Sequence, residues 1–127
     1  MTQSYAKGYK NELELTHKLA SLGYMAIRAP RSGRIGLPSP DIVAAKPGKL
    51  IVIECKAREA AFTVEKEQLQ ELLDWQDKGG ATAYIAWKIS RKGWTFLHLK
   101  DVMENKGNIG KKFANEKGFP IEFLDKI

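Results

Sequence analysis

The chain has 127 residues, a hydrophobic content of 43% and a net charge of +6, which indicates one globular domain with a substantial core. It contains no run of about 18 apolar residues and no signal-peptide pattern, so we expect a cytoplasmic protein with no membrane partner. The single cysteine, Cys55, excludes an internal disulfide and a metal site built from several cysteines.

The excess positive charge lies in the N-terminal part of the sequence. Residues 1–58 hold ten Lys and Arg against four Asp and Glu, a balance of +6, whereas residues 59–127 hold eleven of each sign. A basic surface confined to one part of a chain favours a polyanionic partner such as nucleic acid. A charge that served only solubility would be spread more evenly, and this remains the alternative.

Hydrophobic periodicity and Gly/Pro punctuation predict the elements in chain order. They are a helix over 5–22, a strand over 24–29, a two-stranded hairpin over 40–56, a helix over 65–78, strands over 81–89 and 94–99, and a short helix over 100–104. The segment 121–124 is expected to form a short edge strand or to dock on the body. This order predicts an α/β fold with a mixed five-stranded central sheet flanked by helices, in a single domain over 1–127. The connection through the second long helix makes strand 81–89 parallel to the second hairpin strand.

The first helix carries an apolar stripe that contains an acid. Leu15, Leu19 and Leu22 recur at helical spacing, and Glu12 lies on the same stripe. A carboxylate in line with a core stripe is costly unless it has a partner. Two interpretations stay open: Glu12 marks where the stripe emerges into solvent, or it reaches a metal as a third carboxylate. Lys7 and Lys10 lie at the same end of the helix and are candidates for phosphate contacts.

A basic loop follows the first predicted strand. Arg28, Arg31 and Arg34 surround Ser32 in a stretch punctuated by glycine and proline. Guanidinium groups suit bidentate contact with phosphates, so we interpret the loop as a clamp on DNA. An ordinary solvated connection is the alternative. No base is paired with Ser32 in the manner of a serine hydrolase.

The hairpin over 40–56 carries the candidate chemistry. A turn at Pro47-Gly48 pairs residues whose numbers sum to 95, so Asp41 faces Glu54 with Cβ atoms about 5 Å apart. Lys56 shares that face, whereas Cys55 points to the opposite, apolar face as a core residue.

Two opposed carboxylates repel each other by roughly 3 kcal/mol at this separation. A divalent cation offsets the repulsion, and hard oxygen ligands favour Mg²⁺, with Mn²⁺ as a substitute. A metal beside a lysine is suited to hydrolysis of a phosphodiester. The alternative is a solvated strand face with an exposed ion pair of little energetic value.

These residues carry a resemblance. Pro40-Asp41 followed by Glu54-Cys55-Lys56 matches the PD-(D/E)xK signature of the restriction-endonuclease-like nucleases. Over residues 7–99, the wider pattern closely resembles the archaeal Holliday-junction resolvases, whereas the C-terminal tail lies outside the likeness. The wider pattern comprises Lys7-Gly8, Glu12, Glu14-Leu15, Gly23-Tyr24, Arg28-Ala29-Pro30, Ser32-Gly33, Ile42-Val43, Ile53, Gly79-Gly80 and Trp94.

The resemblance implies a restriction-endonuclease-like fold and a homodimeric, Mg²⁺-dependent endonuclease. Such an enzyme resolves four-way DNA junctions by paired symmetric nicks during recombination and repair. According to this resemblance, the family's metal-binding acids correspond to Glu12, Asp41 and Glu54. Its catalytic lysine corresponds to Lys56. Ser32 matches a serine near the scissile phosphate, and Arg28 a junction-binding residue. No small-molecule organic cofactor is implied.

Two other functions remain open. One is a restriction or repair endonuclease that acts on duplex DNA, which competition between a four-way junction and a linear duplex separates from a resolvase. The other is a non-catalytic junction-binding protein. The presence of Asp41, Glu54 and Lys56 argues against a decayed site.

Overall fold

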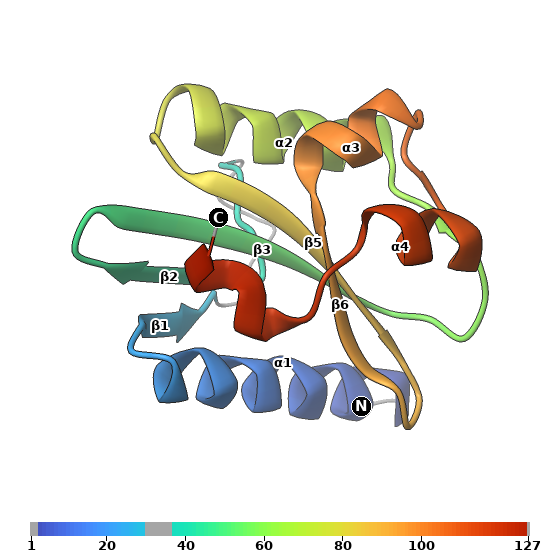
Figure 1. Cartoon of the computed structure of the whole chain (residues 1–127), viewed down its shortest axis with the longest axis horizontal. Helices are drawn as coiled ribbons and strands as arrows, with labels where there is room; N and C mark the ends of the chain where they lie inside the picture. Colours follow the sequence, from blue (N-terminus) through green and yellow to red (C-terminus); the bar gives the residue numbers. More distant parts are fainter. Residues whose placement is uncertain (1–2, 30–36, 127) are drawn as a thin grey trace.

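The computed structural model describes residues 3–29 and 37–126, with side chains over 8–29 and 37–125. In this part of the chain, the main sheet has five strands in the order β1-β2-β3-β5-β6 and lies between helices on both faces (Figure 1). Its strands are β1 (Met25–Arg28), β2 (Ile42–Lys46), β3 (Lys49–Ala57), β5 (Thr82–Ile89) and β6 (Gly93–His98). β3 and β5 run parallel and the other pairs antiparallel, which confirms the predicted mixed sheet.

The turn between β2 and β3 sets the register of the hairpin. Gly48 has φ +75°, a left-handed conformation that glycine adopts at little cost after proline in a turn. Ala45 pairs with Leu50 and Ile42 with Ile53, so the predicted register is confirmed. One further step along the register places Asp41, just before β2, opposite Glu54 in β3.

Helix α1 (Gln3–Ser21) covers one face of the sheet, along the lower side of Figure 1. Leu15 and Leu19 are fully buried and Leu22 packs beside them, as the stripe predicts. They lie against Ile42 and Ile53 of the hairpin. The N-terminal helix is therefore fixed to the two strands that carry the candidate acids.

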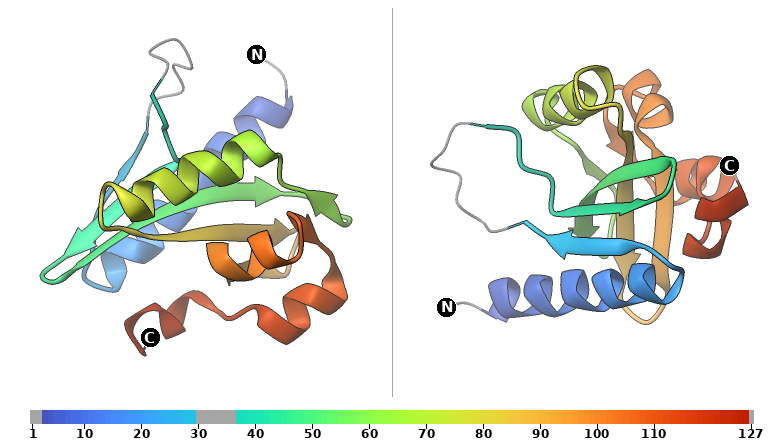
Figure 2. Two further views of the ribbon diagram at one scale, coloured as in Figure 1. Left: turned by 90° about the horizontal axis from the view of Figure 1, so that it is seen from above. Right: turned by 90° about the vertical axis from the view of Figure 1, so that its left-hand side faces the viewer.

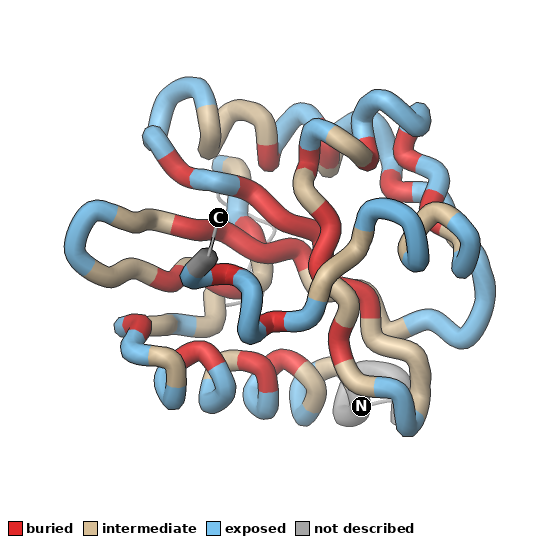
Figure 3. Tube along the Cα trace, viewed as in Figure 1, coloured by how far each residue is buried: buried red, intermediate tan, exposed pale blue. Residues whose placement is uncertain are grey.

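Helix α2 (Lys66–Asp77) covers the opposite face and connects β3 to β5 (Figure 2). Leu69 and Leu72 are buried against Val52 and Ile85. The buried residues in Figure 3 follow β3 and β5 through the middle of the molecule. The crossover through α2 accounts for the parallel pairing of these strands, as expected.

The C-terminal region packs on the sheet through short helices and one short strand. It consists of α3 (Leu99–Glu104), β7 (Asn108–Ile109), which pairs with β4 (Phe62–Thr63), α4 (Lys111–Lys117) and the 3₁₀ helix η1 (Ile121–Lys126). The predicted edge strand over 121–124 is wrong, whereas the docking alternative is confirmed, because Leu124 is fully buried. Pro120 has no N–H to donate to a sheet ladder. Its carbonyl instead accepts a hydrogen bond from the backbone N–H of Phe123, three residues later, as in a 3₁₀ helix.

Among the residues with described positions, no helix is long and apolar enough to cross a bilayer.

Candidate functional site

Three strand ends meet at one edge of the sheet. Because β1, β2 and β3 are successively antiparallel, the end of β1, the start of β2 and the end of β3 lie together. The backbone N–H of Ala29 donates to the Asp41 carbonyl at 2.8 Å, which joins the first two of these ends. Arg28, Asp41 and Glu54 are thereby brought to the same edge.

Asp41 is held against β3 by a backbone hydrogen bond. Its Oδ2 accepts from the N–H of Cys55 at 2.8 Å, so its carboxylate lies beside the peptide unit that follows Glu54. A hydrogen bond from an amide to a carboxylate is charge-assisted and stronger than a neutral one. The pairing of Ile42 with Ile53, one residue away, and this contact therefore bring Asp41 close to Glu54, as expected.

Glu54 is a buried acid that Gln68 and Lys56 contact on the α2 side of the sheet. It is 9% exposed, and its Oε2 accepts from Nε2 of Gln68 at 2.9 Å. The Lys56 ammonium lies 3.7 Å from the same oxygen, with 15% of its side chain exposed. The arrangement brings a carboxylate, an ammonium group and an amide together. Cys55 packs instead against the core under α1, as expected.

Sequence reasoning missed Gln68. The residue lies four positions before the buried Leu72, on the face of α2 that meets the sheet. A polar side chain in line with a core stripe is the same signal that marked Glu12, and here it indicates the hydrogen bond to Glu54.

Glu12 is buried on the α1 side of the sheet. It is 3% exposed, so the interpretation that it marks where the stripe emerges into solvent is wrong. Arg28 donates from Nε to Oε1 of Glu12 at 2.8 Å, and its guanidinium lies 4.3 Å from the centre of the Tyr9 ring. The cost of burying an acid is thus offset by a charged partner on β1.

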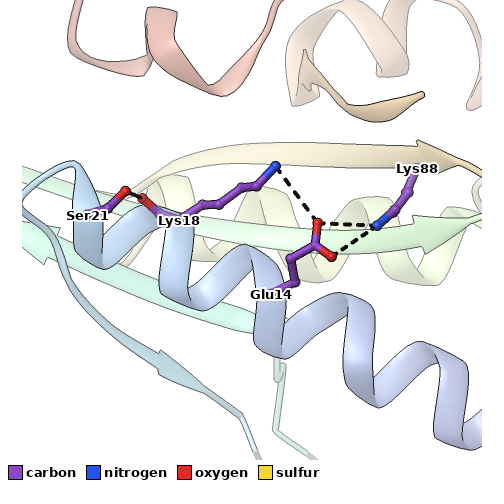
Figure 4. A network of polar contacts seen from close by, with 4 residues as sticks. All are labelled: Glu14, Lys18, Ser21 and Lys88. Atoms are coloured by element: carbon purple, nitrogen blue, oxygen red, sulfur yellow. Dashed lines mark hydrogen bonds and ion pairs between the residues drawn. The ribbon is translucent and has the colours of Figure 1, made fainter. Parts of the chain in front are cut away.

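A polar network fixes α1 to the sheet near this site (Figure 4). Lys88 of β5 donates to both carboxylate oxygens of Glu14, at 3.2 and 3.3 Å. Lys18 lies 3.8 Å from Glu14, and Ser21 donates to the Lys18 carbonyl. Since Glu14 is two residues from Glu12, this network limits how far α1 can shift relative to β5.

The basic candidates are placed only in part. Lys10 is exposed on α1, and Arg28 is partly buried against Glu12. The side chain of Lys7 and the loop residues Arg31, Ser32 and Arg34 lie outside the described residues.

The donor chemistry of Asp41 and Glu54 fits a hard divalent cation. Across the described residues, no group of three or more His, Cys, Asp or Glu side chains is arranged to hold a metal ion. Mg²⁺, however, usually keeps several waters and binds through one or two carboxylates together with substrate phosphates. Two carboxylates on adjacent strand ends therefore suffice as the protein's share of such a site, whereas Glu12, paired with Arg28 on the α1 side, is not grouped with them as a third metal-holding acid.

Comparison with known proteins identifies the family. The model of the archaeal Holliday junction resolvase (Hjc) family matches residues 3–126. The chain belongs to the archaeal Holliday junction resolvase family. The match includes the C-terminal region beyond residue 99, which the sequence motifs did not reach.

Curated members of this resolvase family resemble the chain over most of its length. The crossover junction endodeoxyribonuclease Hjc of Archaeoglobus fulgidus is 34% identical over 96 residues, which are 75% of this chain and 71% of the relative. Its counterpart from Sulfolobus acidocaldarius is 33% identical over 99 residues, 76% of this chain and 68% of the relative. The family is thus one of endodeoxyribonucleases, that is, of hydrolases.

A solved resolvase structure supports the fold. The structure of Archaeoglobus fulgidus Hjc superimposes with a TM-score of 0.80 at 28% identity, and the match covers 89% of this chain and 95% of that one. The mixed sheet flanked by helices is therefore the restriction-endonuclease-like fold that the PD-(D/E)xK motif predicted.

Proposed function

We propose that this resolvase-family chain is a Mg²⁺-dependent crossover junction endodeoxyribonuclease that cuts four-way DNA junctions. The observation that carries the proposal is the grouping of Asp41, Glu54 and Lys56 at one edge of the sheet. Asp41 touches the backbone of Cys55, and Glu54 lies 3.7 Å from the Lys56 ammonium. Mn²⁺ is the expected substitute metal.

The roles of the side chains follow from their chemistry. Asp41 and Glu54 hold the cation, and Glu12 assists from α1. When bound, a divalent cation lowers the pKa of a water and neutralises charge on a phosphoryl oxygen. Lys56 orients the attacking water or offsets the negative charge that develops on the phosphate. The burial of Glu54 and the partial burial of Lys56 strengthen these electrostatic effects, because nearby water is reduced.

Basic residues at the N-terminal end of the site bind the DNA backbone in this proposal. Lys7, Lys10, Arg28, Arg31 and Arg34 contact phosphates, and Ser32 lies near the phosphate that is cut. The support is the balance of +6 in residues 1–58 and the position of this segment directly before Asp41. Contacts to phosphates set affinity and register without reading sequence.

A homodimer fits the same proposal, since two identical sites related by a two-fold axis produce paired symmetric nicks. Two side chains of β1 that face away from α1 support it: Met25 is 81% exposed and Ile27 is 65% exposed. Leu37, before Asp41, is 68% exposed. Exposed apolar side chains gathered on one side of a sheet mark interaction surfaces.

The chain acts as one domain over residues 1–127, inside the cell where its DNA substrate lies.

The decisive experiment is cleavage of a synthetic four-way junction in Mg²⁺ and in EDTA. We expect paired nicks in Mg²⁺ and none in EDTA, with a linear duplex of equal length competing poorly. Equal cleavage of the duplex would indicate a restriction or repair endonuclease instead. Binding to the junction without cleavage in Mg²⁺ or in Mn²⁺ would indicate a structural junction-binding protein.

A further inference from the structure

A side chain outside the nuclease motif contacts Glu54. Gln68 lies in the first turn of α2, a helix anchored on the sheet by Leu69 and Leu72, which are 6% and 3% exposed. Its Nε2 donates to Oε2 of Glu54 at 2.9 Å. The anchoring leucines and the helix backbone fix the position from which the amide reaches Glu54.

Lys56 and Gln68 approach this oxygen with different chemistry. Lys56 brings a full positive charge at 3.7 Å, whereas Gln68 brings a neutral amide at a shorter distance. A neutral donor orients a carboxylate without cancelling the charge that attracts a cation. The amide of Gln68 also keeps the Glu54 carboxylate from turning fully toward Lys56. A closer ion pair with Lys56 would weaken Glu54 as a metal ligand and would leave the lysine less available to the substrate.

We propose that Gln68 is a positioning residue of the cleavage reaction, whose amide holds the Glu54 carboxylate in the orientation that receives the divalent cation. The inference rests on the proposed nuclease function. Gln68 acts through Glu54 and contacts neither the DNA nor the reacting atoms. Side chains that support metal ligands in this way change metal affinity or activity by about 10- to 100-fold when removed.

The test uses two variants and a matched control on the same helix. Gln68→Met keeps the length of the side chain and removes the donor, and Gln68→Ala removes both. Gln70→Ala is the control, because Gln70 is exposed and donates to Asp74 at 3.0 Å, away from Glu54. The thermal stability of every variant is recorded, and three quantities are measured on the full chain: Mn²⁺ affinity without DNA by calorimetry, junction affinity in EDTA, and single-turnover cleavage at saturating junction.

We expect both Gln68 variants to bind Mn²⁺ more weakly and to cleave about 10- to 100-fold more slowly, with junction affinity in EDTA unchanged. The control should match the wild type in all three. Wild-type Mn²⁺ affinity and cleavage in Gln68→Met overturn the inference, and so does a variant with lowered thermal stability but normal metal binding. A wild-type chain that binds no metal and cuts no junction instead overturns the nuclease function itself, and this inference with it.

Discussion

Arg28 and Glu12 form an ion pair between β1 and α1, with a distance of 2.8 Å from Nε to Oε1. The side chains are 18% and 4% exposed respectively, so the acid is almost removed from water while the arginine reaches the surface. Arg28 thus neutralises a buried acid while part of its own side chain stays exposed at the edge of the site.

The first prediction concerns Arg28→Ala. Removal of one member of a buried ion pair costs about 3 kcal/mol or more, because the remaining charge stays in a poorly solvated position. We expect the free energy of unfolding to fall by about this amount in urea titrations, together with weaker junction binding. Arg28→Lys keeps the charge and should lose less stability. If Arg28→Ala weakened DNA binding at wild-type stability, the arginine would be a phosphate contact alone.

The sequence predicts the sheet well because its strands are short apolar runs bounded by glycine and proline. Pro47-Gly48 fixes the hairpin register, and that register brings Asp41 opposite Glu54. The sequence left the burial of Glu12 open, because its place on the leucine stripe fitted either a buried acid with a partner or the point where the stripe emerges into solvent. Which residue would be that partner depends on how α1 crosses β1, which periodicity does not specify.

The parts that the sequence did not predict depend on tertiary contacts. β4 and β7 are two residues each and pair across 45 positions of sequence, as Thr63 and Asn108 show. The segment after Pro120 has an alternating pattern compatible with a strand, but its proline and the burial of Leu124 favour the 3₁₀ helix. Gln68 was missed because its role depends on the distance from α2 to β3.

The second prediction concerns the two acids on the hairpin. Asp41→Asn and Glu54→Gln keep shape and remove charge, so metal binding and cleavage should be lost while junction binding in EDTA survives. Gel-shift and cleavage assays on the same preparations measure both properties. Glu67→Gln, on the exposed side of α2, is the charge-matched control and should behave as the wild type. Parallel loss of binding and cleavage would argue that the acids maintain the fold and do not bind the metal.

The third prediction concerns the cluster of Tyr24, Lys46 and Asp125, which fixes η1 to the hairpin. Tyr24 donates to Asp125 at 3.2 Å, and the Lys46 ammonium pairs with the same carboxylate. Burial, with the nearby Asp125 carboxylate, raises the pKa of Tyr24 to about 12. The hydrogen bond from Lys46 holds the pKa of Asp125 below its usual value.

The signs of these shifts define a range of pH. Tyr24 stays protonated up to about pH 12 in the folded protein but ionises near pH 10 in the unfolded chain. Its contribution to the free energy of unfolding is therefore complete below about pH 10 and is lost toward pH 12. The contribution of Asp125 is present above about pH 4 and is lost as the pH falls through its lowered pKa. Urea titrations from pH 3 to 12 should show both losses. Tyr24→Phe should make the alkaline loss shallower, with the remainder due partly to Tyr84, whose pKa is raised by burial. An unchanged alkaline slope would exclude Tyr24 as its source.

The fourth prediction concerns salt. If the basic loop grips phosphates, the logarithm of the junction-binding constant should fall with the logarithm of salt concentration, by about 0.9 per phosphate neutralised. Arg31→Ala and Arg34→Ala should each reduce this slope by about one. Lys100→Ala, exposed on α3, serves as the control and should leave the slope unchanged. An equal reduction of the salt slope in all three variants would show that the net charge of the protein governs binding and that the loop arginines make no specific phosphate contacts.

The last prediction concerns the exposed apolar side of β1. Met25 and Ile27 alternate with Ala26, which packs toward the core under α1, so both face the opposite side of the sheet. A charge placed at the centre of a two-fold interface is repeated on both copies, so repulsion is added to the loss of apolar contact. If the chain dimerises through this side of β1 as proposed, we expect Ile27→Glu to sediment as a monomer at concentrations where the wild type sediments as a dimer, and to release single nicks in place of paired ones. Met103→Glu, on α3 and 36% exposed, should remain dimeric. A dimer that survived Ile27→Glu would place the interface on another surface, because a carboxylate at a residue that is 65% exposed in one chain does not disturb the fold itself.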